Sequence, residues 1–164
     1  MRRGSRMTEH HLAQINIARM VAPLDDPAMA DFVAQLADVN ALADRSPGFV
    51  WRLQSEEGDS TSIRVFDDPL VLVNMSVWEN VEALQQFVYE SSHRLVMRDR
   101  KKWFRKMDGP YYALWWIPRG HTPTVDEGKE RLAHLATHGA TSHAFWFGTN
   151  FAPPLERDVV LSKL

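Results

Sequence analysis

Two hydrophobic periods alternate along the chain. Residues 11–19 (HLAQINIAR) and 49–54 (FVWRLQ) alternate polar and apolar positions, as β-strands do. Residues 70–78 (LVLVNMSVW) are rich in β-branched and apolar side chains, which favours a central strand. Residues 111–118 (YYALWWIP) are apolar on both sides, which favours a strand that is buried on both faces. The pattern therefore predicts four strands.

Between the strands, apolar side chains recur at helical spacing. Residues 25–48 place one stripe on the first helix: Phe32, Leu36, Val39 and Ala43. Asn80 caps a second helix in this interpretation, and the same period resumes over residues 96–107. A last helix begins at Thr124, whose spacing to Glu127 matches a capping box.

The order of these elements predicts an α+β fold built on a ferredoxin-like β-α-β-β-α-β unit. A C-terminal helix and a short extra strand at residues 144–148 (AFWFG) complete it. We expect residues 1–10 to be a flexible extension, residues 11–154 to be one domain and residues 155–164 to be a tail. Because residues 111–118 cannot leave either face in water, we expect the sheet of a second subunit to cover one face, which makes a homodimer.

Composition narrows the classes of function. The chain has 164 residues, a formal net charge of −2 and no cysteine. The charge gives no reason to expect nucleic acid or a membrane as partner, and the missing cysteine excludes disulfides and thiolate chemistry. No apolar run reaches the length of a membrane span, and we expect a cytoplasmic protein. The sequence also has no Ser–His–Asp pattern, phosphate loop or dinucleotide fingerprint.

Three stretches resemble one known family. They are SPGFVWRL after the first helix, VWENVEALQQFVY followed by a histidine, and YYALWWIPRGHTPTVDEGKERL. Over residues 11–154 the chain resembles the bacterial family called domain of unknown function 3291, of the dimeric α+β barrel superfamily. That superfamily also holds antibiotic-biosynthesis monooxygenases and haem-degrading monooxygenases. The resemblance implies the fold and the dimer, while the superfamily spans cofactor-free oxygenases, haem enzymes, isomerases and non-catalytic members.

The haem-degrading relatives offer one comparison at residue level. Their iron is surrounded by an Asn on the first strand, a Trp on the second helix and a His after it. Here Asn16 and His93 match in placement, but the helix position between them is Phe87. The set is incomplete, so a role of His93 in linking helices, an acid–base role and haem ligation all stay open, with Arg94 near enough in sequence to meet a propionate.

Polar residues on the predicted strands point to a site independently. Gln14 and Asn16 share one strand face, and Asn74, Ser76 and Trp78 share another. Amides and hydroxyls on central strands cost stability unless each finds a hydrogen-bond partner. They indicate either a polar cavity or water between two sheets.

The C-terminal histidines have a weaker pattern. His134 and His138 are four residues apart on the last predicted helix, and His143 follows. This spacing suits a metal, but the glutamate of an H-E-x-x-H motif is missing, so surface histidines are favoured and no metal is predicted.

The leading hypothesis is a small-molecule enzyme with monooxygenase-like chemistry on a planar aromatic or polyketide-like substrate, without a tightly bound cofactor. His93 would remove a proton and Asn16 would help hold the resulting oxyanion. The residues expected to contact substrate are Gln14, Asn74, Ser76, Trp78, Phe87, Arg94, Trp103 and Trp116. The alternatives are a non-catalytic dimeric ligand-binding protein and a haem-binding oxidoreductase with His93 as ligand.

Overall fold

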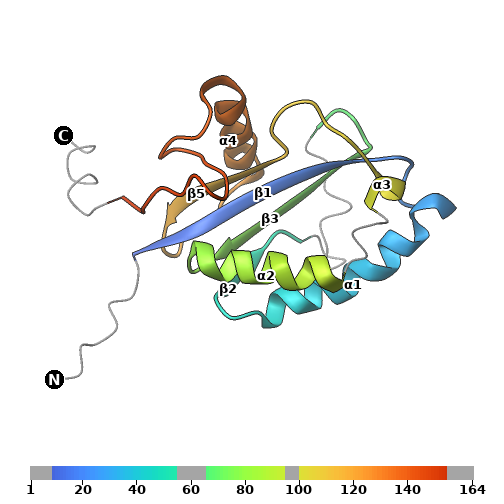
Figure 1. The fold of residues 1–164 in the computed structure, drawn as a ribbon, viewed down its shortest axis with the longest axis horizontal. Helices are drawn as coiled ribbons and strands as arrows, with labels where there is room; N and C mark the ends of the chain where they lie inside the picture. Colours follow the sequence, from blue (N-terminus) through green and yellow to red (C-terminus); the bar gives the residue numbers. More distant parts are fainter. Residues whose placement is uncertain (1–8, 55–65, 95–99, 155–164) are drawn as a thin grey trace.

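A computed structural model describes residues 9–54, 66–94 and 100–154, with backbone alone for residues 92–94. The strands are β1 (His10–Met20), β2 (Phe49–Arg52), β3 (Val71–Trp78), β4 (Phe104–Arg105) and β5 (Tyr112–Pro118). The helices are α1 (Ala30–Arg45), which follows the 3₁₀ turn η1 (Pro27–Met29), α2 (Val81–Arg94), α3 (Arg100–Trp103) and α4 (Val125–His138) (Figure 1).

The five strands form one antiparallel sheet with β1 near its centre. The order is β2-β3-β1, and the far edge of β1 pairs first with β5 and then, at its last two residues, with β4. Strand β3 therefore lies between β1 and β2. The chain passes from β1 to β2 by a long crossover through α1. This is the split βαβ arrangement, and the prediction of a ferredoxin-like α+β fold is confirmed.

Helices lie on both faces of the sheet. Helices α1 and α2 run side by side along one face, and α4 stands on the other (Figure 1). The alternation of β1 divides its side chains accordingly: Leu12 packs with residues of α1 and α2, whereas Ile15 packs with Leu132 and Leu135 of α4. Among the helices in the described ranges, none has the length and apolar character needed to cross a membrane.

The helix starts follow the predicted capping chemistry. Asn80 Oδ1 accepts a hydrogen bond of 2.8 Å from the Ala83 N–H, which caps α2. Thr124 and Glu127 form the expected capping box at the start of α4. The helix predicted over residues 96–107 is wrong at its C-terminal end, and residues 96–99 lie outside the described part of the chain. Helix α3 ends at Trp103 and the chain continues as β4, because Trp103 packs in an apolar cluster with Met20 and Met29 and the next two residues pair with the end of β1.

The apolar strand β5 is covered on both faces within one chain. Helix α4 lies over Trp115, which is fully buried, and Phe145 packs on the other side against Leu114. The extra strand expected at residues 144–148 shrinks to one bridging residue, Phe145, opposite Leu114. The apolar character of β5 therefore does not require a second subunit, and the homodimer stays a prediction.

Helix α4 approaches the sheet at a glycine. A Cβ atom added to Gly128 would lie 2.6 Å from Cδ1 and 3.3 Å from Cβ of Ile15 on β1. We therefore expect Gly128→Val to lower the free energy of unfolding by about 1–3 kcal/mol, the usual cost of overpacking a core. The matched control is Ala133→Val on an exposed position of the same helix, where only helix propensity changes, by less than about 1 kcal/mol. Chemical denaturation of both variants checks this, and equal losses would contradict the close packing of α4 on β1.

Candidate functional site

Three polar side chains stand in one row across three adjacent strands. Asn16 of β1 pairs with Asn74 of β3 on one edge and with Tyr112 of β5 on the other. Residues directly opposite each other in antiparallel strands point to the same face, about 5 Å apart. We call Asn16, Asn74 and Tyr112 the polar row. It lies on the face that carries α1 and α2.

The next row toward the start of β1 is buried and closed by its own hydrogen bonds. Gln14 Nε2 donates to Ser76 Oγ at 2.7 Å and to Asn74 Oδ1 at 2.8 Å. Ser76 Oγ also accepts from Trp78 Nε1 at 2.8 Å. These bonds give the Gln14 amide nitrogen, the Ser76 hydroxyl and the Asn74 carbonyl oxygen partners within the sheet, as polar groups on central strands require.

Solvent reaches the sheet at the polar row. On the same face of β1, Leu12 is 0% exposed and Met20 is 2% exposed. Asn16 lies midway between them and is exposed, while Asn74 and Tyr112 are half-buried. Each end of this strand face belongs to a different apolar cluster. An exposed amide at the middle of a strand paired on both edges therefore marks an accessible polar patch between two apolar clusters.

Tyr112 is the member of the polar row that sequence reasoning did not find. Its phenol oxygen accepts the Phe147 N–H at 3.2 Å, so its own proton can be donated elsewhere. Burial raises the pKa of Tyr112 above its ordinary value, helped by the neighbouring Tyr111, and the bond from Phe147 opposes the shift. Tyr112 is thus a neutral donor, and only the register of β1 with β5 could have pointed to it.

The aromatic side chains expected to contact substrate are packed against protein. Trp78 is fully buried, and its ring stacks on Phe87 of α2 with centroids 5.0 Å apart. Trp103 is 4% exposed in the cluster with Met20. Trp116 is half-buried and donates its Nε1 to the Phe151 carbonyl at 2.7 Å. Phe87 and Trp116 therefore remain accessible in part, and contact of any of the four with substrate stays a prediction.

The two remaining candidates lie at the end of α2. His93 and Arg94 belong to the last helical turn, and their side chains lie outside the described part of the structure. Their roles stay predictions.

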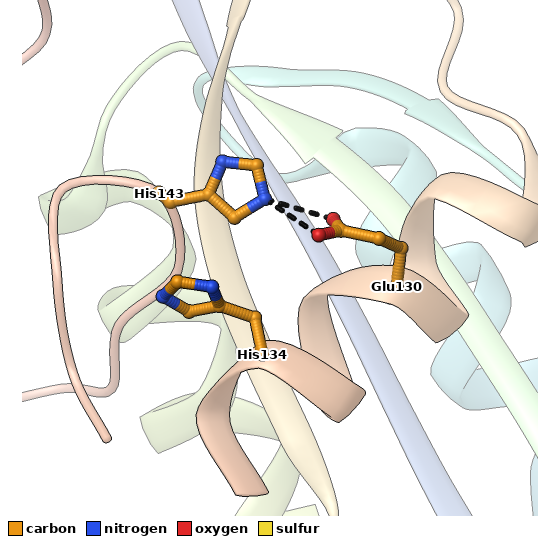
Figure 2. Close-up of side chains that lie close together, drawn as sticks. All are labelled: Glu130, His134 and His143. Carbon is orange, nitrogen blue, oxygen red and sulfur yellow. Dashed lines mark hydrogen bonds and ion pairs between the residues drawn. The ribbon is translucent and has the colours of Figure 1, made fainter. Parts of the chain in front are cut away.

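A second group of chemically active side chains gathers at α4. Glu130 and His134 project from neighbouring turns of the helix, and His143 reaches them from the segment that follows (Figure 2). His143 Nε2 lies 2.8 Å from Oε1 and 2.9 Å from Oε2 of Glu130. The sequence reasoning noted both histidines but missed Glu130, which is the helical neighbour of His134 at four residues' spacing.

Burial and neighbouring charges shift the pKa values of Glu130 and His134. Burial alone would raise the pKa of Glu130, but hydrogen bonds from His143 and Arg131 outweigh it and lower the pKa. Burial lowers the pKa of His134, and the neighbouring His143 and His138 add to this shift because a second positive charge nearby is unfavourable. In this group Glu130 is therefore favoured as a charged carboxylate and His134 as a neutral imidazole.

The antiparallel sheet, its split βαβ order and the helices on it define a ferredoxin-like α+β protein. The chain belongs to the family described as domain of unknown function DUF3291, whose model matches residues 11–161. No curated protein sequence matches the chain.

Several solved structures resemble the fold. SnoaB of Streptomyces nogalater, described as a cofactor-independent oxygenase, shares 19% identity over 70% of this chain and 98% of its own, with a TM-score of 0.45. PA3566 of Pseudomonas aeruginosa shares 13% identity over 71% of this chain and 100% of its own, with a TM-score of 0.46. The ActVA-Orf6 monooxygenase of Streptomyces coelicolor, in complex with nanaomycin D, shares 20% identity over 70% of this chain and 91% of its own, with a TM-score of 0.36. At these values the likeness concerns the fold alone.

Tyr112 can be tested by its titration. We expect the tyrosinate absorbance of wild type minus that of Tyr112→Phe to show a midpoint above the ordinary tyrosine pKa. Because folding favours the neutral phenol, the stability it contributes is present below the ordinary pKa. It is lost as pH rises through the raised one. Unfolding of both proteins over this pH range should show wild type losing more stability, and a midpoint at or below the ordinary value would refute the burial of Tyr112.

Proposed function

We propose that the protein is a small-molecule enzyme with monooxygenase-like chemistry, which binds a planar aromatic or polyketide-like substrate over the polar row and uses no tightly held cofactor. The reaction class comes from the resemblance to the superfamily of antibiotic-biosynthesis monooxygenases. The location of the proposed substrate site comes from this chain's own residues. The observation that carries the proposal is the exposed Asn16 in the middle of a strand face whose two ends, at Leu12 and Met20, are buried.

The chemistry of the polar row suits an oxygen-bearing substrate. The amides of Asn16 and Asn74 and the phenol of Tyr112 are neutral groups with protons to donate, and they stand at paired positions of three neighbouring strands, with the phenol oxygen beside the Phe147 N–H. Neutral donors fixed by a rigid sheet stabilise a developing oxyanion without the cost of burying a charged partner. The neighbouring Gln14–Ser76 row positions Asn74, because Gln14 Nε2 donates to the Asn74 oxygen. The apolar clusters on either side suit the flat rings of the substrate.

The proposed reaction balances without an outside reductant. A base, for which His93 is our candidate, removes a proton from a substrate CH₂ group next to a carbonyl or phenol, and the row holds the enolate or phenolate oxygen. The substrate carbanion gives electrons to O₂. One oxygen atom becomes a carbonyl on that carbon and the other leaves as water, so that CH₂ plus O₂ becomes C=O plus H₂O.

A second function has its own support. The buried row of Gln14, Ser76 and Trp78 is closed by internal hydrogen bonds, and the polar row offers donors but no proton acceptor of high basicity. A site whose described residues are donors without a base suits binding without turnover. The alternative is therefore a ligand-binding protein that uses the same residues.

Oxygen consumption with a planar probe separates these functions. We use anthrone, a tricyclic ketone with an acidic CH₂ group, and expect O₂ uptake above the rate in buffer. Asn16→Leu should reduce kcat by about 10²–10³, the usual effect of losing one oxyanion donor. Asn150→Leu, an exposed amide outside the row, is the matched control and should retain the wild-type rate.

The same assay tests His93. As a general base it should lose about 10²–10⁴ in rate on replacement by Ala, with little change in melting temperature. Binding of anthrone without O₂ uptake would select the ligand-binding alternative. A Soret band in the purified protein would instead point to haem and against the cofactor-free proposal.

The homodimer implied by the family resemblance is part of this proposal. Because α4 and Phe145 pack on β5 within one chain, we expect a partner to bind at another surface. Light scattering of dilute protein should give about twice the chain mass of 18.8 kDa. A mass equal to one chain would remove the dimer and leave the polar row as a site of the single subunit.

A further inference from the structure

The group at α4 brings two imidazoles and a carboxylate to one point. The donor atoms of Glu130, His134 and His143 all lie within 4.8 Å of one another (Figure 2). The three come from two segments, because the chain turns back after α4 at Gly139, which adopts a positive φ of 72°. The polar row lies on the opposite face of the sheet from α4, so this group is separate from the proposed oxygenase site.

The spacing of the closest pair already suits a shared ion. Two ligands each about 2.1 Å from a transition metal lie roughly 3.0–3.4 Å apart at octahedral or tetrahedral angles. The gap of 2.8 Å between His143 Nε2 and Glu130 Oε1 is close to that edge. A cation would replace the proton that now bridges them, and the His134 donor atom, which lies within 4.8 Å of the other two, would move closer to become the third ligand.

Thr141 orients both histidines. Its Oγ1 lies 2.7 Å from His134 Nε2 and accepts the His143 backbone N–H at 3.1 Å. With Nε2 of His134 engaged, Nδ1 is the ring nitrogen left for a ligand bond. A hydrogen bond on the far nitrogen is how proteins fix the orientation and tautomer of a metal-bound histidine.

The donor set selects the kind of ion. Imidazole nitrogens favour late first-row transition metals, whereas Mg²⁺ and Ca²⁺ prefer sites made of oxygen alone. Arg131 also donates to Glu130, which leaves one carboxylate oxygen for an ion and weakens the attraction of a second charge. Because Glu130 and His143 are exposed, water can fill the remaining coordination positions.

From this geometry we propose that Glu130, His134 and His143 bind a divalent first-row transition-metal ion of the Zn²⁺ class, with Thr141 as the positioning residue. The ion would join α4 to the segment that carries His143. The proposal stands independently of the oxygenase activity.

Calorimetric titration of untagged, chelator-treated protein tests the site. We expect saturable binding of Zn²⁺ near one ion per chain, no binding of Mg²⁺ at the same concentrations, and a rise in melting temperature with Zn²⁺ that EDTA reverses. Addition of Co²⁺ should give visible absorption bands that report coordination by nitrogen and oxygen. Absence of saturable Zn²⁺ binding overturns the proposal.

Variants assign the ligands. Glu130→Gln, His134→Ala and His143→Ala should each weaken Zn²⁺ binding at least tenfold and abolish the Zn²⁺-dependent rise in melting temperature. The matched control is His121→Ala. His121 pairs with Glu127 at 2.8 Å near the start of the same helix, but within the described residues this pair belongs to no group of three possible ligands. Because a variant can lower the metal-free melting temperature by itself, the shift on adding Zn²⁺ is compared. Binding that survives all three variants, or falls equally in the control, overturns the assignment.

Thr141 has a distinct expected result. Thr141→Val should weaken Zn²⁺ binding by about 10–100-fold while the Co²⁺ spectrum keeps its shape, because the ligands are unchanged and only their orientation is lost. Thr141→Ser keeps the hydroxyl and should restore affinity. Equal affinity in wild type and Thr141→Val would remove Thr141 from the site.

Discussion

Strand β1 is paired along both edges and covered over most of both faces, and this constraint determines what its side chains must do. Its backbone donors and acceptors are taken by β3 on one side and by β5 on the other. Apolar residues such as Ile15 meet α4, and Gln14 points the opposite way, toward the layer of α1 and α2. A polar side chain on such a strand is stable only if neighbouring strands supply its partners or if solvent reaches it. Gln14 shows the first outcome and Asn16 the second.

The segment after α4 connects parts of the molecule that are far apart in sequence. His143 bonds to Glu130 on the helix, Phe145 exchanges backbone hydrogen bonds with Leu114 on β5, and Phe147 donates its N–H to the Tyr112 phenol. Five consecutive residues thus link one face of the sheet to the other around the edge strand. Through Phe147 this segment contacts the Tyr112 end of the polar row, although the segment itself carries none of the proposed catalytic side chains.

Local periodicity was enough to predict the main strands and helices in their order, because most of the patterns are complete within one element, but it extended a helix over the residues that form β4. It was also enough to predict that Gln14 and Asn16 share a face, since alternation in a strand is strict. It could not give the register between strands, which depends on the whole sheet, and so the neighbour relation of Asn16 with Tyr112 was missed. The burial of β5 was predicted correctly, but the covering element came from the same chain, because a helix 14 residues long follows it and lies back across the sheet. Glu130 was overlooked because its partner His143 is 13 residues away and on a different segment.

The two polar groups differ in how they can treat charge. The polar row holds amides and a phenol, all neutral, and the buried Gln14 and Ser76 beside it are hydrogen-bonded to each other. Such a surface can stabilise an anion that forms during a reaction but has little attraction for a cation. The group at α4 contains a carboxylate whose pKa is lowered and imidazoles that are exposed or half-buried, so it attracts positive charge. Since the sheet lies between them, each group keeps its own electrostatic character, and a cation bound at α4 leaves the neutral donors of the row free to hold a substrate oxyanion.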